Sequence, residues 1–295
     1  MDIKMRIKEC IKENVVIYKI MYPVVFVCRY IYGVLGKTMM FYIKYFLRKL
    51  HLLPCDKNLL KYKNKHRNSR IFIVATGPSL RIEDLEWLER QGEITIAVNG
   101  IFKIFEKTNW RPTYYALDDF YLYESYKNKK IEIVPSQVSK KGVFYSEPVR
   151  KYVSVDLNEI ENISYIPICY YDHWFTHYSK LFRYNREIQY GHFDAYTVTN
   201  FAINIADYMG ASNIYILGAD CDFCQKKAHI GEDEKGVEYE NSKNMQNAQQ
   251  RGYRFVNKKV NISRTKVMNA TRGGKLEEFP RCSMDELINN TALTR

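Results

Sequence analysis

The feature that most constrains the fold is a series of short apolar runs that alternate with helical patterns. Residues 71–75 (IFIVA) are apolar, largely β-branched, and end at a Gly-Pro turn, which is typical of a buried central strand. Residues 82–91 follow with apolar side chains at helical spacing, and residues 94–98 form a second apolar run. Strands that alternate with helices in this way predict an α/β domain with a doubly wound, mainly parallel sheet.

Later segments continue the pattern. We expect further strands at residues 113–117, 131–134, 143–145, 213–217 and 266–269, and helices at 196–209 and 283–288. Ser283 stands at the expected N-cap of the last helix. The domain is therefore predicted over residues 71–288, followed by a short tail at 289–295. Residues 156–194, which are irregular and rich in Tyr, His and Phe, are interpreted as a lid or acceptor-side subdomain.

The positive charge of the chain is confined to its N-terminal part. The net charge is +12, and residues 1–70 contain 16 Lys/Arg against 4 Asp/Glu. The remaining 225 residues contain 29 of each sign and are neutral. A nucleic-acid groove across the domain is disfavoured, because such a groove needs a basic surface there. Nucleic acid is thus not an expected partner.

The first 56 residues have a composition of their own. No acidic residue occurs between Glu13 and Asp56, whereas aromatic and aliphatic residues are frequent and basic residues interrupt them regularly. The longest charge-free apolar run, 20–28, is far shorter than the roughly 20 residues of a membrane-spanning helix. Tolerating one arginine extends the run to 20–36, so a single span stays open.

We expect residues 1–56 to form a basic, aromatic-rich helical extension on an anionic membrane surface. The alternative is a helical hairpin packed against the domain. The start has no secretory-signal pattern, and seven cysteines without a regular spacing suit a reducing compartment. The predicted location is therefore cytoplasmic, peripheral on the inner face of the cell membrane, with residues 57–70 as a basic linker.

The turn after the first predicted strand is the strongest functional signal. Gly77 allows the backbone to turn tightly and approach a ligand, and Pro78 fixes the turn. Ser79 is placed to cap the following helix, whose N–H groups attract phosphate. The sequence is neither a Walker P-loop nor a GxGxxG fingerprint. A purely structural turn is the alternative interpretation.

Other predicted strands also end in polar residues. Asn99, Asp118 and the Gly218–Asp220 turn each follow an apolar run. In doubly wound sheets the carboxyl ends of the strands converge on one ligand-binding crevice. We expect Asn99 to bind a base or sugar, and Asp118 or Asp220 to accept from ribose hydroxyls. The sequence thus predicts a site for a phosphorylated ligand, most simply a nucleotide.

Two further motifs bear on this site. After the last predicted strand, Asn269 and Thr271 offer donors and acceptors, Gly273 permits close approach, and Arg272 is placed to meet a phosphate. Asp220-Cys221-Asp222 matches a DxD metal pattern, and Cys221 with Cys224 and His229 could suggest zinc. Both patterns are short, so neither predicts a metal site.

At this point the chain resembles known families. The GPSL turn, residues 197–223 (TVTNFAINIADYMGASNIYILGADCDF) and residues 267–279 (VMNATRGGKLEEF) together resemble the Maf-type flagellin-modification family and the related pterin-diphosphokinase-like (MptE-like) domains. The first two segments more distantly resemble bacterial sialyltransferases of the Campylobacter lipooligosaccharide type. The resemblance covers roughly residues 71–288.

The resemblance implies a Rossmann-like transferase, often with a CMP-activated nonulosonic acid as donor. By analogy the donor site would be lined by Gly77, Ser79, Asn99, Asp118, Thr197, Thr199 and Asp220. The sialyltransferases use a histidine base on the loop after the GxD strand, and His229 is the histidine there in this chain. The surrounding loop departs from their motif, and Asn99 lacks its usual glutamine neighbour. His173, His177 and His192 remain rival candidates.

The predicted function is that of a glycosyltransferase in bacterial surface-glycan assembly, with a CMP-type nucleotide-sugar donor and a glycan acceptor. No metal is expected for a CMP donor, because one phosphate needs little charge neutralisation; Mg²⁺ is expected if the donor is a nucleoside diphosphate. One alternative is Mg²⁺-dependent pyrophosphoryl transfer from ATP, with Asp118, Asp119, Asp220 and Asp222 around the metal. Another is a non-catalytic membrane-attached scaffold.

Overall fold

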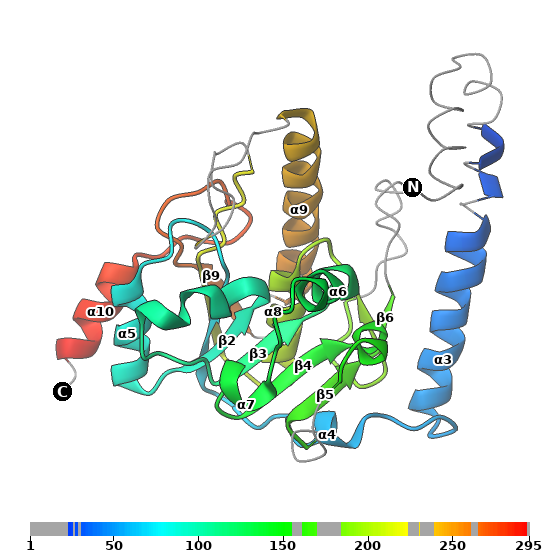
Figure 1. The fold of residues 1–295 in the computed structure, drawn as a ribbon, viewed down its shortest axis with the longest axis horizontal. Helices are drawn as coiled ribbons and strands as arrows, with labels where there is room; N and C mark the ends of the chain where they lie inside the picture. The colour runs from blue at the N-terminus through cyan, green and yellow to red at the C-terminus, as the bar shows by residue number, and fades with distance from the viewer. Residues whose placement is uncertain are drawn as a thin grey trace.

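A single parallel sheet forms the centre of the structure, a computed structural model that describes residues 23–25, 27–28, 31–154, 161–169, 184–223, 230, 239–260 and 265–293. Its seven strands have the order β5-β4-β3-β2-β1-β8-β9 (Figure 1). Their bounds are β1 Arg70–Val74, β2 Ile94–Val98, β3 Tyr114–Leu117, β4 Gly142–Ser146, β5 Ile163–Ile166, β8 Asn213–Leu217 and β9 Lys266–Asn269. The predicted doubly wound, Rossmann-like α/β fold is confirmed.

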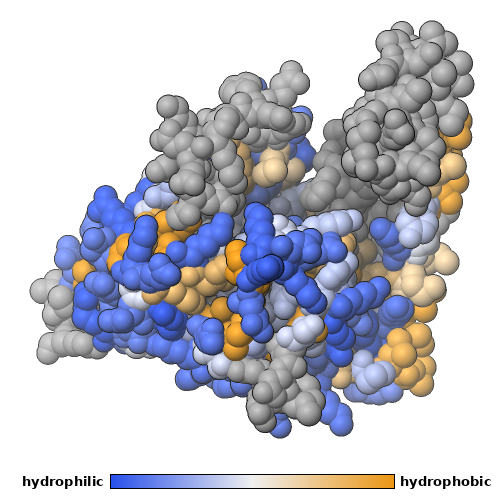
Figure 2. Space-filling view, viewed as in Figure 1, coloured by the Kyte–Doolittle hydropathy of each residue, from blue (hydrophilic) through white to orange (hydrophobic). Residues whose placement is uncertain are grey.

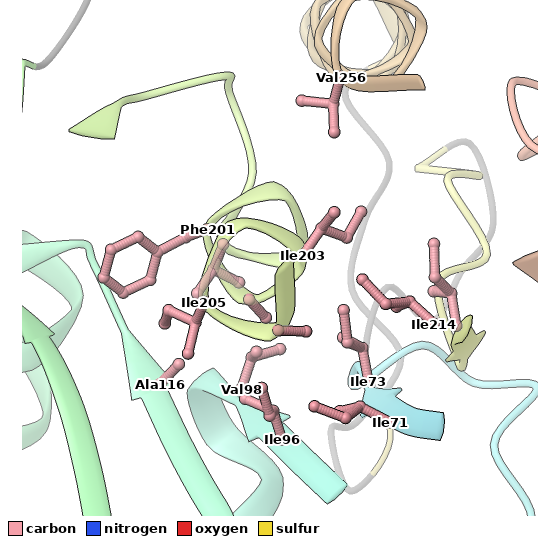
Figure 3. Close-up of a cluster of buried hydrophobic side chains, with 14 of the residues drawn as sticks. Ile71, Ile73, Ile96, Val98, Ala116, Phe201, Ile203, Ile205, Ile214 and Val256 are labelled. Carbon is pink, nitrogen blue, oxygen red and sulfur yellow. The ribbon is translucent and has the colours of Figure 1, made fainter. Parts of the chain in front are cut away.

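Helices cover both faces of the sheet, because successive residues of each buried strand point to opposite sides. Ile71 and Ile73 of β1 belong to one core, and Phe72 and Val74 belong to the other. The first core is closed by α8 (Val198–Tyr208) and α9 (Tyr239–Val260), as Figure 3 shows for Phe201, Ile205 and Val256. The second is closed by α5 (Ile82–Gln91), η2 (Asn99–Lys107), α6 (Phe120–Asn128) and α10 (Met284–Leu293).

Several predicted elements differ from the structure. The predicted strand 131–134 does not form; these residues lead directly into the short helix α7 (Pro135–Val138). The neighbour of β3 in the sheet is therefore β4. The region interpreted as a lid, 156–194, contributes the edge strand β5 and the small pair β6 (Ile168–Cys169) and β7 (His192–Phe193). Its residues 155–160 and 170–183 lie outside the described part of the chain.

The segment predicted as a basic linker, 57–70, instead packs against the domain through two buried side chains, Leu59 and Tyr62. It contains the helical turn α4 (Lys57–Leu60), and its Tyr62 is 5% exposed. The Tyr62 ring packs against Phe144 of β4, with ring centroids 4.9 Å apart. The backbone N–H of His66 donates to the carbonyl of Met209, 2.8 Å away, at the end of α8. Its charged side chains point outward, which explains why the sequence reads as a linker.

The described part of the N-terminal extension is helical, as predicted. It comprises η1 (Ile31–Thr38) and α3 (Met39–Lys49), which stands beside the sheet (Figure 1). Phe41 of α3 packs edge-on against Phe193 of β7, with ring centroids 4.8 Å apart. Over the described residues, no helix combines the length and the apolar character that crossing a bilayer requires.

Candidate functional site

The strand order places a switch point between β1 and β8. From β1 the chain builds β2, β3, β4 and β5 on one side, and then returns to add β8 and β9 on the other. The loops that leave β1 and β8 therefore run in opposite directions from neighbouring strands. In open α/β sheets a ligand crevice forms at this position, outside the carboxyl ends of the strands. The predicted Gly77 and Gly218 turns both lie there.

The two turns are bonded to each other. The Gly77 N–H donates to the carbonyl of Gly218, 2.7 Å away. The Ser79 hydroxyl donates to Oδ2 of Asp220 at 2.9 Å, and the Ser79 N–H approaches the same oxygen at 3.3 Å. This corrects the predicted role of Ser79 as a helix cap, because α5 begins only at Ile82 and has no side-chain cap. The Ser79 hydroxyl is therefore engaged by Asp220 and not by the start of the helix.

Gly77 has no room for a side chain in this arrangement. A Cβ atom on Gly77 would lie 1.9 Å from Oδ2 of Asp220 and 2.4 Å from the Gly218 carbonyl oxygen. Pro78, the next residue, is half-buried. Burial raises the pKa of Asp220, whereas its hydrogen bonds from Ser79 lower it. In this structure the glycine serves the packing of the two turns.

The turn after β9 supports the same corner. The Thr271 hydroxyl accepts from the Ala219 N–H at 3.1 Å, and the buried Asn269 holds Thr271 by accepting its N–H at 3.0 Å. Gly273, with φ of +89°, has open space where a side chain would be. Asn269 and Thr271 are therefore shaping residues of the turn, and Gly273 is its exposed point.

Arg272 does not point to a phosphate site, contrary to the prediction. Its guanidinium binds both carboxylate oxygens of Asp84, at 2.8 and 2.9 Å, and also pairs with Asp285. Asp84 is buried in α5, and Asp285 lies in α10. Arg272 therefore ties the turn after β9 to two helices.

The acidic side chains near the crevice have partners of their own. Asp222 pairs with Nζ of Lys275 at 3.0 Å, and Asp220 is bound by Ser79. Asp119 caps α6 by accepting the N–H of Tyr121 at 2.8 Å. Across the described ranges, no group of three or more His, Cys, Asp or Glu is arranged to hold a metal ion.

Asn99 offers an unsatisfied acceptor at the end of β2. Its backbone has φ of +49°, a left-handed conformation that is uncommon outside glycine. Its side-chain Oδ1 is buried without a hydrogen-bond partner, whereas its carbonyl accepts from the Tyr115 hydroxyl at 2.7 Å. Buried polar atoms are normally paired, so a ligand N–H or O–H would relieve this atom.

Asp118 lies at the end of β3 near a carboxylate that the sequence did not single out. It is 6% exposed, and burial, together with the charges of Asp194 and Asp119, raises its pKa well above the ordinary value. Asp194 follows β7 and accepts the backbone N–H of Tyr196 at 2.9 Å. No local pattern marks Asp194, because only the return of the chain after β6 brings it near β3.

Thr197 and Thr199 lie at the start of α8. The Thr197 hydroxyl accepts the Thr199 N–H at 3.3 Å and so caps the helix. The same hydroxyl is 3.5 Å from that of Tyr253 in α9, and Thr199 is buried. Both threonines thus face α9, whose length of 22 residues the sequence reading had missed.

The predicted base, His229, lies outside the described residues, as do His173 and His177. The next residue, Ile230, is described: its N–H donates to the carbonyl of Thr76 at 2.6 Å. His192 is a core histidine, with Nδ1 2.7 Å from Oδ1 of Asn204 and Nε2 buried without a partner. Burial lowers the pKa of His192 to about 4.

The fold and the switch-point turns define a Rossmann-like α/β protein. Within this class, the family model described as "6-hydroxymethylpterin diphosphokinase MptE-like" matches residues 46–226. The chain belongs to this MptE-like family. The match begins inside α3, so it includes the segment 57–70 that packs into the core.

Three solved structures illustrate the likeness. The Maf glycosyltransferase of Magnetospirillum magneticum AMB-1 is 14% identical with a TM-score of 0.44; the match covers 80% of this chain and 40% of that one. The Campylobacter jejuni sialyltransferase CstII, solved with cytidine-5'-monophosphate, is 15% identical with a TM-score of 0.41; the match covers 74% of this chain and 86% of that one. An alpha-2,3-sialyltransferase from Campylobacter jejuni is 14% identical with a TM-score of 0.40, and the match covers 75% of this chain and 84% of that one. A search among curated proteins finds no match.

Proposed function

We propose that the chain is a glycosyltransferase that moves a sugar from a nucleotide donor to a glycan acceptor. The observation that carries this proposal is the hydrogen bond from the Ile230 N–H to the Thr76 carbonyl. It brings Ile230 to the turn after β1, at the switch point. Ile230 is the residue that follows His229 in the sequence, and His229 is the base that we propose.

The proposed donor is a CMP-linked nonulosonic acid, used in bacterial surface-glycan assembly at the inner face of the membrane. One feature supports this choice over a nucleoside diphosphate: the acidic side chains near the crevice are engaged by Ser79, Lys275 and the start of α6. The unsatisfied Oδ1 of Asn99 suits the amino group of a base or a sugar hydroxyl, as any nucleotide-sugar donor provides.

The reaction would proceed by base-assisted substitution. His229 would remove the proton of an acceptor hydroxyl, and the acceptor oxygen would form a bond to the anomeric carbon of the donor sugar. The bond between that carbon and the phosphate oxygen would break, and CMP would leave with the bonding electron pair. Nucleotide binding would require the Asp220 carboxylate to share or give up its place at Ser79.

Nucleotide-dependent stabilisation tests the proposal. We would measure the melting temperature of the full chain with CMP, CDP, UDP, GDP and ATP, each with and without Mg²⁺. A ligand that binds only the folded state raises the melting temperature. Cytidine nucleotides are expected to stabilise the protein most, without a need for Mg²⁺. Release of CMP from a CMP-linked nonulosonic acid, on addition of a glycan acceptor, would then establish transfer.

The family description favours a second candidate, pyrophosphoryl transfer from ATP to a hydroxymethylpterin. Stabilisation by ATP alone, strictly dependent on Mg²⁺, with AMP formed when the pterin is added, would replace the first proposal with this one. Absence of stabilisation by all five nucleotides would favour the non-catalytic scaffold.

A further inference from the structure

The helix α3 has two different sides, and one is fixed to the domain. Phe41 is buried against Phe193, and a Cβ atom on Gly191 would lie 2.4 Å from the Phe41 ring. Tyr45 packs edge-on against Tyr190, with ring centroids 5.9 Å apart, and Arg48 pairs with Glu147 at 3.4 Å. Aromatic packing and an ion pair therefore hold α3 in one orientation.

The opposite side of α3 carries large hydrophobic residues that face outward. Their exposed fractions are 57% for Met39, 43% for Ile43, 54% for Phe46 and 65% for Leu50. These four residues recur every three or four positions, so they line one side of the helix. Figure 2 shows hydrophobic side chains along the edge of the molecule formed by this helix. We call these four residues the lipid face.

The charged residues of α3 and of the sequence next to it are all positive. No Asp or Glu occurs between Glu13 and Asp56, and the exposed Lys37, Lys44 and Lys49 lie on or beside α3. A helix with an apolar side and basic flanks binds in the interface of an anionic bilayer, because its lysines meet lipid phosphates. A protein partner would need acidic side chains opposite these three lysines to match them.

We propose that the lipid face of α3 binds directly to an anionic lipid bilayer and holds the domain in a fixed orientation on the membrane. This goes beyond the proposed transfer reaction and does not depend on it. Because the other side of α3 packs on β7, the bilayer contact and the domain are rigidly joined. The membrane contact is thus a surface of the folded protein, distinct from any contact made by residues 1–30.

Vesicle flotation of the full chain tests the proposal. The probes are vesicles of equal parts phosphatidylglycerol and phosphatidylcholine, and vesicles of phosphatidylcholine alone. The variant Ile43→Asp with Phe46→Asp places two acids on the lipid face. The matched control, Tyr121→Asp with Met245→Asp, makes the same change at residues 69% and 52% exposed on α6 and α9. Circular dichroism would check that each variant is folded.

The wild type and the control are expected to float with anionic vesicles, and the lipid-face variant to partition at least ~10-fold less. Replacement of Lys37, Lys44 and Lys49 by glutamine is expected to weaken partitioning by ~100-fold at low salt, since each lysine near the surface contributes about 1 kcal/mol.

Equal binding by the lipid-face variant and the control would overturn the proposal, as would failure of the wild type to bind either vesicle. A wild-type dimer in solution that the lipid-face substitutions convert to a monomer would assign the face to a second copy of the chain instead.

Discussion

Gly77 is expected to contribute to the stability of the folded protein, whether or not it also contacts a ligand. Alanine at this position would place a Cβ atom 2.4 Å from a backbone oxygen, which cannot move without shifting β8. We expect Gly77→Ala to lower the free energy of unfolding by about 1–3 kcal/mol, the usual effect of overpacking. Urea unfolding followed by circular dichroism measures this change.

Gly36→Ala is the matched control, because a Cβ there would make an ordinary contact at 3.7 Å. Gly36 lies in a helical segment, where alanine is more favourable than glycine, so we expect no loss of stability. If both variants unfold at the same urea concentration, the turn after β1 has more room than the structure shows. The close approach of a ligand would then again be the reason for the glycine.

His229 is expected to affect turnover more than binding. If it is the general base, His229→Ala should lower turnover by ~10²–10⁴-fold, and the acidic limb of the pH–rate profile should disappear. CMP affinity, measured by calorimetry, should change little, because the imidazole would face the acceptor. His51→Ala, at an exposed histidine, serves as the control. Near-normal turnover in the His229 variant would remove it from the proposed mechanism.

At single positions the sequence predicted the place of the polar residues better than their partners. Asn99, Asp118 and Asp220 do follow strand ends, because short apolar strands are easy to delimit. Two contacts depend on residues more than a hundred positions apart in the sequence: Asp220 accepts from Ser79, and Arg272 donates to Asp84 instead of to a phosphate. The residues next to each side chain in the sequence do not indicate such distant partners.

At the scale of elements, the segment 57–70 is expected to behave as core. Tyr62→Ala would remove a ring that packs against Tyr114 and Phe144, and a hydroxyl that donates to the Lys141 carbonyl at 3.1 Å. We expect a loss of about 3–5 kcal/mol in the free energy of unfolding, typical of large-to-small core changes.

Chemical denaturation of Tyr62→Ala and of Tyr121→Ala, at a tyrosine 69% exposed, would be compared. The Tyr121 variant is expected to lose less than about 0.5 kcal/mol, as is usual at surface positions. A Tyr62 variant as stable as the Tyr121 variant would restore the linker interpretation.

Which elements could be predicted follows from their burial. Central strands such as β2 and β8 are apolar on both faces, so their bounds were predicted correctly. The edge strand β5 (ISYI) lies in an aromatic-rich stretch without clear alternation and was missed. The helix α9 was missed because its sequence is mostly polar, and only residues such as Tyr253 and Val256 reach the core. Residues 131–134 look like a strand, but Pro135 begins a helix there.

At the scale of the whole molecule, the buried His192 is expected to make stability depend on pH. Its pKa is about 4 in the folded state, against about 6.5 when unfolded. The unfolded state therefore binds the proton first as the pH falls. Stability is lost between about pH 6.5 and 4, by an amount on the order of 3 kcal/mol, and no further below pH 4.

Urea unfolding from pH 7 to 4 would compare the wild type with His192→Gln, which keeps a donor for Asn204. The variant should show a flatter pH dependence over this window, whereas His51→Gln should follow the wild type. The difference between proteins is the informative quantity, because Asp118, with a raised pKa, titrates in the opposite sense. Parallel curves for the wild type and His192→Gln would contradict the assignment.

The place of β1 in the sheet has a consequence for how the chain is made. Arg70 pairs with Asn213 in register, so one edge of β1 stays bare until β8 has been synthesised. During that interval a sheet that consists only of β1 to β5 would expose the backbone N–H and C=O groups of β1, and this open edge could pair with a neighbouring nascent chain. Pairings between distant segments also form slowly. Fragments that end before residue 213 are therefore expected to aggregate, and the full chain to need chaperone protection during translation.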